Sequence, residues 1–419
     1  MKKILMLLAL PFFIACGAKE ESLELTVQAD PSWVQYYQNA AQKVMDANPG
    51  TKISIVEIGA FDLLQKVTET DITNPDVTDL FSYPLDKLTV LSGKEALASF
   101  DAKKLAEKIG GFDDYDNGLG GKLVINGNYL GFPTNIETLV TFYNKKNAEI
   151  NNVDLTKKQE VIQKDINTIT LPIFNAWYAI ALLNSADIDL LTKKDGKFYS
   201  DMTKDFDKLT KKEKDVISTL YEYWKKATEQ KATLFDVDAT WGYIDEQFKN
   251  GNKGVFRIDG PWAVPSLVGL TDDLDVLPIG IITVKGVPIR HWKSGWAIGI
   301  NARIEENNKK MQLAEQFIAE ILNPKTADIY FKQTGKIMPN VSKEEFDKLD
   351  LKDMDKKVIA AVIDSYKTAA DVPTEKEWSR VWETWQHAIL SWDISKPKNV
   401  KEAYKEIKAS FDAMMSNME

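Results

Sequence analysis

The sequence predicts an α/β fold that is divided into more than one domain. Strand-like and helix-like patterns alternate along the first part of the chain, which is typical of parallel strands joined by helical crossovers. At 419 residues, 44% of them hydrophobic and 27% charged, the chain is long enough for two or three domains. No long linker rich in proline or serine separates its halves. We therefore expect the chain to pass between domains through short strands.

The first elements follow from the spacing of apolar residues. Residues 23–27 (LELTV) alternate apolar and polar side chains as a strand does, and residues 52–58 and 77–83 predict two further strands. Residues 31–48 place apolar side chains on one helical face before Asn-Pro-Gly ends the helix, and residues 61–70 predict a second helix. This order of strand, helix and strand predicts a mainly parallel sheet.

Two hairpins are predicted by their turn residues. Asn126-Gly127 in KLVINGNYLGF supplies the two positive-φ positions of a tight turn between apolar runs. The segment KKDGKFY predicts a second hairpin within a later portion of the chain that is largely helical.

The N-terminus has the pattern of an export signal. Two lysines precede the apolar run ILMLLALPFFIA, which is too short to span a bilayer. The run ends on Phe-Ile-Ala before Cys16, the only cysteine of the chain, and this resembles the lipobox of bacterial lipoproteins. The resemblance implies a signal peptide at 1–15, lipidation of Cys16 and a polar tether at 16–22. Cleavage after Gly17 or Ala18, giving an unanchored exported protein, is the alternative.

Composition excludes several classes of function. The formal net charge is -9 and the lysines are dispersed among acids, so a nucleic-acid partner is not expected. One cysteine and two histidines, His291 and His387, leave no disulfide, no metal cluster and no recognisable catalytic triad. We expect no cofactor, and we expect His387 to be structural.

Aromatic side chains are the main candidates for ligand binding in the sequence. It contains 11 tryptophans, and several lie at turns or helix starts, where a flat ring can stack on a sugar while nearby carboxylates bind its hydroxyls. Trp224 and Trp392 are assigned to the core. The spacing of Trp378, Trp382 and Trp385 fits a core stripe and a binding face equally well.

Three stretches in order resemble one family. They are NGNYLGFPTNIETLVTFYNKK, IDEQFKNGNKGVFRIDGPW and GWAIGIN. With the lipobox, they are similar to the extracellular solute-binding proteins of ABC importers, in the branch of maltose- and maltodextrin-binding proteins. The resemblance implies a periplasmic-binding-protein-like (type II) fold, with two α/β lobes around a ligand cleft and a hinge that the chain crosses several times.

The resemblance also implies where the chain crosses the hinge. The crossings are expected near Ile136-Glu137, near Trp292 to Gly295 and near Leu322-Asn323. The first lobe would then comprise 23–135 plus 294–322, and the second lobe 136–293 plus 323–419.

The family's ligand-binding positions can be carried over residue by residue. They imply as sugar ligands Asp30, Tyr83, Asp86, Lys87, Glu137, Trp177, Tyr178, Trp262 and Trp382. Tyr83 and Lys87 stand where the family has Trp and Arg, which puts the identity and length of the sugar in doubt. In GVFRIDGPW, Gly260 is expected to permit a sharp reversal and Pro261 to begin a helix, so that Trp262 faces the cleft.

Together these expectations describe a protein that binds a ligand and catalyses no reaction. The chain is expected to be a monomeric, exported and lipid-anchored protein that binds a sugar or oligosaccharide and delivers it to a membrane permease. A non-sugar ligand such as a polyol, peptide or polyamine is an alternative within the family. A secreted glycosidase with paired carboxylates and an adhesin that binds no small molecule are alternatives outside it.

Overall fold

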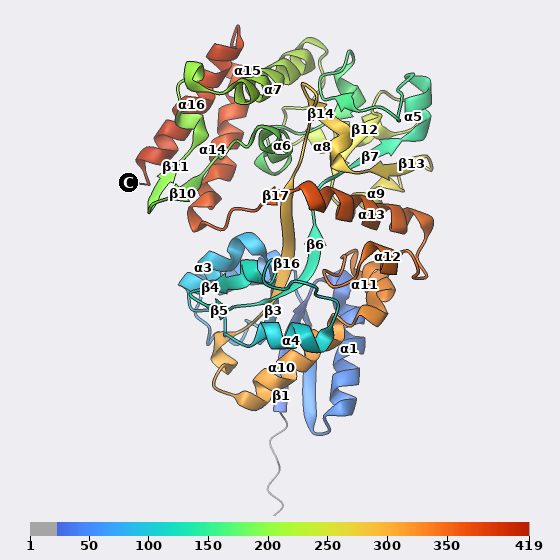
Figure 1. Cartoon of the computed structure of the whole chain (residues 1–419), viewed down its shortest axis with the longest axis vertical. Coiled ribbons are helices and arrows are strands. Elements are labelled where there is room, and N and C mark those ends of the chain that lie inside the picture. The colour runs from blue at the N-terminus through green and yellow to red at the C-terminus, as the bar shows by residue number, and fades with distance from the viewer. Residues whose placement is uncertain (1–22, 419) are drawn as a thin grey trace, which may run out of the picture.

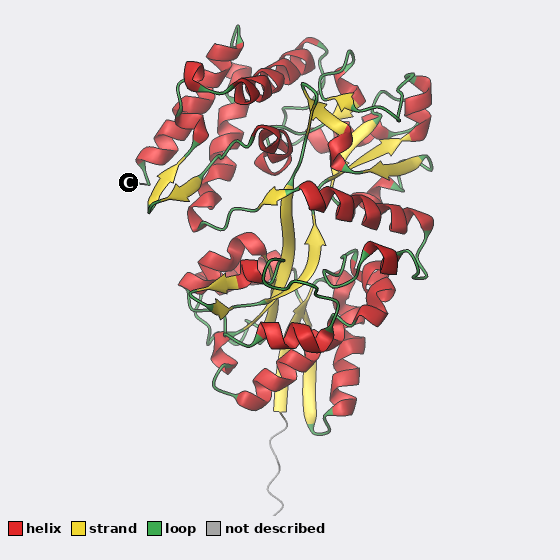
Figure 2. Ribbon diagram, in the orientation of Figure 1, coloured by secondary structure: helices red, strands yellow, loops and turns green. Residues whose placement is uncertain are grey.

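The structure, a computed structural model, describes residues 23–418. Figure 1 shows two halves, one above the other, with the central strands β6 (Phe132–Glu137) and β16 (Trp292–Ile300) running between them. Figure 2 shows that each half has its own strands with helices packed around them. Within the described residues, no helix has the length and apolar content that crossing a bilayer would require.

The lower half is built on the sheet that the sequence predicted. β1 (Leu23–Ala29) lies between β2 (Thr51–Glu57) and β3 (Leu80–Pro84) and runs parallel to both. The two predicted helices are also confirmed, as a short 3-10 turn at Pro31–Trp33 followed by α1 (Val34–Ala47) and as α2 (Ala60–Glu69).

The same sheet continues toward the centre of the molecule with antiparallel strands. Its order is β17-β16-β3-β1-β2, with β6 also paired to β16. The strand β16 is antiparallel to β3 and β6 and parallel to the short β17 (Ala370–Asp371). The helices α4 (Ala102–Ile109) and α10 (Asn308–Ile321) cover the sheet in this half. Parallel pairing therefore holds among the first three strands, whereas β6 and β16, which lead between the halves, are antiparallel to each other.

The upper half contains a smaller mixed sheet. Its order is β13-β7-β12-β9, formed by Leu274–Leu277, Val140–Asn144, Phe256–Asp259 and Ile169–Thr170. Both β12 and β13 are antiparallel to β7, and only β9 runs parallel to β12. The prediction of a mainly parallel sheet was made from residues 23–83 and does not extend to this sheet, in which only the β9–β12 pair is parallel.

Long helices complete the upper half. They are α6 (Ala176–Leu183), α7 (Lys211–Glu229), α8 (Thr240–Phe248), α13 (Asp353–Thr368), α14 (Ser379–Leu390) and α16 (Val400–Ser416). Trp224 and Trp392 lie in this core as predicted, with ring nitrogens bonded to Asp393 and to the Ala403 carbonyl. Trp385 is also a core residue, fully buried and bonded to the Ile173 carbonyl. His387 is exposed on α14.

Both predicted hairpins are present. The strands β4 (Val124–Ile125) and β5 (Asn128–Tyr129) flank Asn126-Gly127, whose φ angles are 52° and 84°. The strands β10 (Thr192–Lys194) and β11 (Lys197–Tyr199) flank Asp195-Gly196, with φ angles of 51° and 80°. These positive values are what asparagine or aspartate followed by glycine accommodates at low cost.

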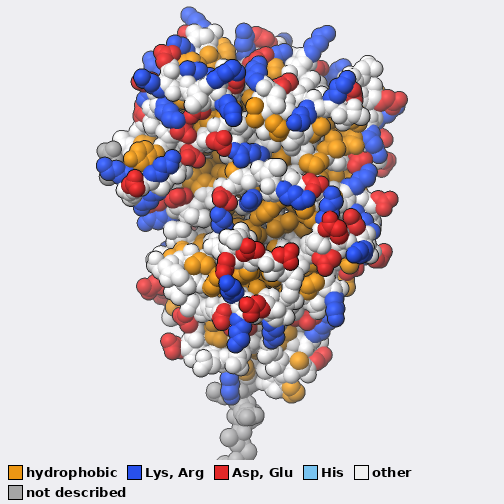
Figure 3. All heavy atoms as spheres, viewed as in Figure 1, with side chains coloured by type: hydrophobic (Ala, Val, Ile, Leu, Met, Phe, Trp, Pro, Cys, Tyr) orange, Lys and Arg blue, Asp and Glu red, His pale blue; other side chains and the backbone are white. Residues whose placement is uncertain are grey.

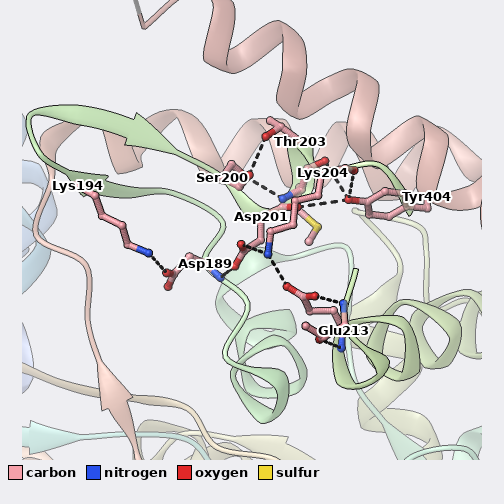
Figure 4. A network of polar contacts seen from close by, with 10 residues as sticks. Asp189, Lys194, Ser200, Asp201, Thr203, Lys204, Glu213 and Tyr404 are labelled. Carbon is pink, nitrogen blue, oxygen red and sulfur yellow. Dashed lines mark hydrogen bonds and ion pairs between the residues drawn. The ribbon is translucent and has the colours of Figure 1, made fainter. Parts of the chain in front are cut away.

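A polar network follows the second hairpin and ties the outer helices together (Figure 4). Lys204 lies 2.6 Å from Asp201 and 2.9 Å from Glu213, which caps the start of α7. The hydroxyl of Tyr404, on α16, lies 2.9 Å from the Lys204 carbonyl. The network therefore holds the segment between β11 and α7 against α16, away from the centre of the molecule.

Residues 323–341 remain in the lower half, although the predicted third crossing at Leu322-Asn323 would place them in the upper half. The helix α11 (Ala327–Thr334) lies in the lower half, where the Tyr330 ring packs on Tyr36 and its hydroxyl donates to the Thr134 carbonyl at 3.0 Å. Ile337 then pairs with Ile136. The chain reaches the upper half only after α12 (Lys343–Phe346), because the apolar face of α11 is buried against α1.

Candidate functional site

A cavity of about 480 Å³ lies between the two halves, and we call it the aromatic cavity. It is lined by Phe61, Pro84, Asp86, Lys87, Glu137, Trp177, Trp262, Trp292, Ser294, Trp296, Lys336, Val372 and Trp382. Six of the nine predicted ligand-binding residues, including Glu137, therefore line one cavity, and they come from both halves of the molecule. On the face shown in Figure 3, hydrophobic side chains gather between the halves. A hollow with several aromatic rings and a few charged groups has the make-up of a small-molecule site.

The strand β16 supplies three side chains of this wall. Trp292, Ser294 and Trp296 occupy alternate positions and therefore point to the same side of the strand. The sequence analysis missed all three as site residues. The start of WKSGWAIGI carries the signal that could have found them, since its first, third and fifth residues are Trp, Ser and Trp.

Trp262 is the most exposed tryptophan of the cavity wall, with 44% of its surface accessible. It lies in a 3-10 turn that begins at Pro261, as predicted. Gly260 has a different role from the expected one, because its φ of -94° is open to any residue. A Cβ on Gly260 would lie 2.1 Å from the Trp262 ring. The glycine is therefore needed because the ring folds back over its Cα.

Trp177 and Tyr178 point in different directions from the start of α6 (Ala176–Leu183). Trp177 lines the aromatic cavity, with its ring 6.3 Å from that of Trp262. Tyr178 is buried, and its hydroxyl lies 3.3 Å from Asp259. Of the two predicted rings, only Trp177 is therefore brought to the cavity, since consecutive helical residues lie about 100° apart around the axis.

Asp259 connects the two segments that carry the aromatic wall. Its carboxylate accepts a hydrogen bond from the Gly260 amide at 2.9 Å and from Arg257 at 3.1 Å, besides the Tyr178 hydroxyl. Both Arg257 and Asp259 are buried. A buried, fully paired carboxylate at this point fixes the turn that presents Trp262 relative to the helix that presents Trp177.

Tyr83 lies in the core and not in the cavity. Its side chain is fully buried, and its hydroxyl donates to the Leu130 carbonyl at 3.0 Å. The ring lies against Gly131 and Gly299. The structure does not bring Tyr83 to the cavity, because β3 turns its next residue, Pro84, to the cavity, opposite Trp296.

Of the predicted charged residues, Asp86 and Lys87 line the aromatic cavity and Asp30 does not. Asp86 and Lys87 line the cavity and form an ion pair at 3.3 Å, and burial raises the pKa of the Asp86 carboxyl. Asp30 does not line the cavity, and its carboxylate accepts the Ala60 amide at 3.0 Å, at the start of α2. Burial raises the pKa of Asp30 despite this bond.

Trp382 lines the aromatic cavity, and Trp378 lies behind it. The two rings are 4.9 Å apart, and Trp378 is buried with its ring nitrogen bonded to the Leu191 carbonyl. Trp378 also lines a small hollow shared with Asp86 and Lys87. The C-terminal tryptophan group therefore contributes one ring to the cavity wall, one support behind it and one core residue.

Glu137 and Lys336 form a charged pair on the floor of the cavity. Lys336 lies 3.4 Å from Glu137, and its ammonium group lies 4.8 Å from the centre of the Trp296 ring. Glu137 also accepts from the Asn135 amide at 3.3 Å. The sequence predicted Glu137 but missed Lys336, which comes from the loop after α11 and has no motif that would identify it.

A second cavity of about 570 Å³ shares this floor, and we call it the polar cavity. It is lined by Ser32, Asn135, Ile136, Glu137, Pro261, Trp262, Val264, Pro265, Phe331, Lys332, Gln333, Thr334, Gly335, Lys336, Lys352 and Asp355. Glu137, Trp262 and Lys336 line both cavities. Among the described residues, no cluster of His, Cys, Asp and Glu is arranged to hold a metal ion.

His291 supports Trp177 from inside the protein. It is fully buried, its Nε2–H donates to the Trp177 carbonyl at 2.8 Å, and its ring centre lies 4.5 Å from that of Trp177. Burial lowers the pKa of His291 to about 3. The imidazole is therefore neutral at physiological pH and acts as a packing group under the cavity wall.

The family is established by the match of residues 39–347 to the profile of bacterial extracellular solute-binding proteins. The chain belongs to this family. Both cavities of this family member are lined by residues from its two halves.

Two relatives match this solute-binding protein over most of its length. One, from Streptococcus pneumoniae, is a maltooligosaccharide ABC transporter solute-binding lipoprotein, 22% identical over 94% of this chain and 92% of its own. The other is the maltodextrin-binding protein MdxE of Bacillus subtilis, 23% identical over 85% of this chain and 82% of its own.

Solved structures have the same fold. The maltose-binding periplasmic protein MalE of Listeria monocytogenes, in complex with maltose, has a TM-score of 0.71 at 18% identity and covers 94% of this chain and 98% of its own. MalX of Streptococcus pneumoniae, in complex with maltopentaose, has a TM-score of 0.67 at 20% identity and covers 93% of this chain and 99% of its own. The type II periplasmic-binding fold predicted from the sequence is thus confirmed.

Proposed function

We propose that this protein is the ligand-binding component of an ABC importer and that its ligand is a maltooligosaccharide. The observation that carries the proposal is the aromatic cavity, in which Trp177, Trp262, Trp296 and Trp382 from both halves surround the ion pairs Asp86–Lys87 and Glu137–Lys336. Flat rings suit the apolar faces of glucose units, and carboxylates and ammonium groups suit their hydroxyls. The names of the two relatives support the same ligand class.

Binding would bring the two halves together around the sugar. The sequence-based division places the crossings near Ile136-Glu137, Trp292 to Gly295 and Leu322-Asn323. We propose that the first two lie at β6 and β16 and that the third lies after α12, because α11 packs in the lower half. An open form captures the ligand, and a ligand that contacts both halves favours the closed form through its extra contacts there. The closed protein then presents its outer surface to a membrane permease.

Export and anchoring belong to the same proposal. The signal peptide at 1–15, the tether at 16–22 and Cys16 lie outside the described residues. We propose that the mature protein begins at a lipidated Cys16, remains on the outer side of the cell membrane and acts as a monomer. Metabolic labelling with a lipid precursor, compared between the wild type and Cys16→Ser, tests the anchor. Release of both proteins in unlabelled form would contradict it.

Ligand class is tested by a thermal-shift series. We expect maltose and longer α-1,4 glucans to raise the melting temperature of the protein, because a ligand at a hundredfold excess over Kd stabilises it by about 2.7 kcal/mol. Polyols, peptides and polyamines form the comparison set. A shift with one of these and none with any glucan would overturn the proposal.

Absence of enzymatic activity is also part of the proposal. Incubation with maltoheptaose, with the products followed by chromatography, should leave the chain length of the sugar unchanged. Shortened products in the presence of pure protein would favour the glycosidase alternative.

A further inference from the structure

Phe61 is an aromatic side chain that the core of the lower half does not use. The buried residues of α2 are Ala60, Leu63, Leu64 and Val67, which form its packing face. Phe61 lies off this face, with 62% of its surface accessible. Single exposed apolar residues are common on protein surfaces, so the place of Phe61 in the fold decides whether it has a role.

That place is the wall of the aromatic cavity. The ring centre of Phe61 lies 5.3 Å from that of Trp296, and the two ring planes are inclined at 71°. Two rings at this angle form a corner between a helix of the lower half and the strand β16. An apolar corner of this kind suits the C–H face of a sugar ring.

The segment 23–135 brings no other aromatic ring to this cavity. Its cavity residues are Phe61, Pro84, Asp86 and Lys87, and of these only Phe61 is aromatic. Tyr83, the ring that the resemblance implies for this half, is fully buried and bonded to the Leu130 carbonyl. Phe61 therefore occupies the role that Tyr83 leaves open.

The start of α2 is fixed by Asp30, which comes from the loop after β1. Gly59 precedes the helix and has no side chain to cap it. Instead, the Asp30 carboxylate accepts a hydrogen bond from the Ala60 amide at 3.0 Å. The first amides of a helix have no partner within it, so this bond sets the backbone position next to Phe61. Asp30 itself does not line the aromatic cavity.

The turn after Asp30 supports the other ring of the corner. The Trp33 amide donates to the Asp30 carbonyl at 2.8 Å. Trp33 is buried, and its ring centre lies 6.4 Å from that of Trp296, with the planes at 86°. One short turn therefore holds the Phe61 ring through the start of α2 and the Trp296 ring through direct packing.

We propose that Phe61 supplies the ring contact of the lower half to the ligand and that Asp30 is a positioning residue, which holds Phe61 in the cavity wall through the Ala60 amide. This inference rests on the proposed function, since the contact needs a ligand with an apolar ring face. A sugar that stacks on Phe61 below and on Trp262 above contacts both halves, which is the condition for favouring the closed form.

Titration calorimetry with maltotetraose tests the ring contact. Phe61→Ala should raise Kd roughly five- to fiftyfold, the scale of covering most of one phenylalanine ring. Phe61→Tyr keeps the ring and should bind within twofold of the wild type. The matched control is Ile329→Ala, which removes an exposed apolar side chain of α11 in the same half that lines neither cavity. It should leave Kd unchanged.

A double-mutant cycle separates positioning from direct contact. Asp30→Ala removes the acceptor of the Ala60 amide, so it should raise Kd in the wild type. It should cause no further loss in the Phe61→Ala background, because its effect passes through the ring. Asp30→Asn keeps an acceptor oxygen for the amide and should bind within twofold of the wild type. Thermal melting checks that each variant is folded.

Each result decides one part of the inference. A folded Phe61→Ala protein whose Kd lies within twofold of the wild type overturns the ring contact while the proposed function stands. Equal losses from Asp30→Ala in both backgrounds overturn the positioning role. Where Asp30→Ala does not fold, a tenfold loss in Asp30→Asn that persists in the Phe61→Ala background overturns that role. A wild type that binds no glucan overturns the proposed function, and this inference with it.

Discussion

Trp262→Ala is the substitution that tests the cavity wall most directly. The ring is 44% exposed, lines both cavities and lies 6.3 Å from Trp177. It makes no hydrogen bond that the fold depends on, since the turn beneath it is held by Asp259 and Gly260. Its removal should therefore change ligand affinity much more than stability.

The expected loss follows from the exposed area of the ring. A large aromatic side chain presents up to about 250 Å², so 44% of it leaves about 110 Å² for a ligand to cover. At about 25 cal/mol per Å², full coverage is worth about 2.7 kcal/mol and coverage of half the area about 1.4 kcal/mol. We expect a loss of about 1 to 3 kcal/mol, or roughly 5- to 150-fold in Kd.

Titration calorimetry with maltotetraose measures the loss, and thermal melting checks the fold. Tyr199→Ala is the matched control, because Tyr199 is a similarly exposed aromatic (49%) on the β10–β11 hairpin and lines neither cavity. A folded Trp262→Ala protein whose Kd lies within twofold of the wild type would refute the assignment of Trp262 as a sugar platform.

Two more predictions concern the support of the wall. Gly260→Ala should weaken glucan binding, measured by titration calorimetry, because the new Cβ displaces the Trp262 ring. The control is Gly242→Ala, at a helical glycine with open space around it, which should leave the glucan affinity unchanged. Equal glucan affinities of the two variants would contradict this role of Gly260. Below pH 6.5 the unfolded chain binds a proton at His291 that the native state, with a pKa of about 3, does not, so stability should fall by about 1.4 kcal/mol per pH unit between 6.5 and 3. Denaturant unfolding at pH 7 and 5 should show this loss in the wild type and in His387→Gln but not in His291→Gln, and an identical pH dependence in all three would disprove it.

Much of the lower half could be predicted from local patterns. Strand alternation and helical periodicity act over a few residues, so 23–27, 52–58 and the helices after them were placed within a few residues of their observed bounds. Both hairpin turns followed from single pairs of residues that tolerate positive φ.

The direction of individual side chains was less predictable. Tyr83 and Tyr178 belong to the right segments but point into the core, while Pro84 and Trp177 beside them line the cavity. Adjacent residues of a strand or helix face different environments. A resemblance that slips by one position therefore exchanges a binding residue for a core residue.

By itself the sequence determined the α/β class, the order of the first elements, the two hairpin turns and, through the resemblance, the family. Tertiary structure decided which charges and rings share a cavity, because contacts such as Lys336 with Glu137 and Trp296 join segments far apart in the chain. It also decided that α11 packs against α1, since the burial of its apolar face depends on the surface it meets. Patterns along a chain record local geometry, whereas a binding site depends on distances that only the packed fold sets.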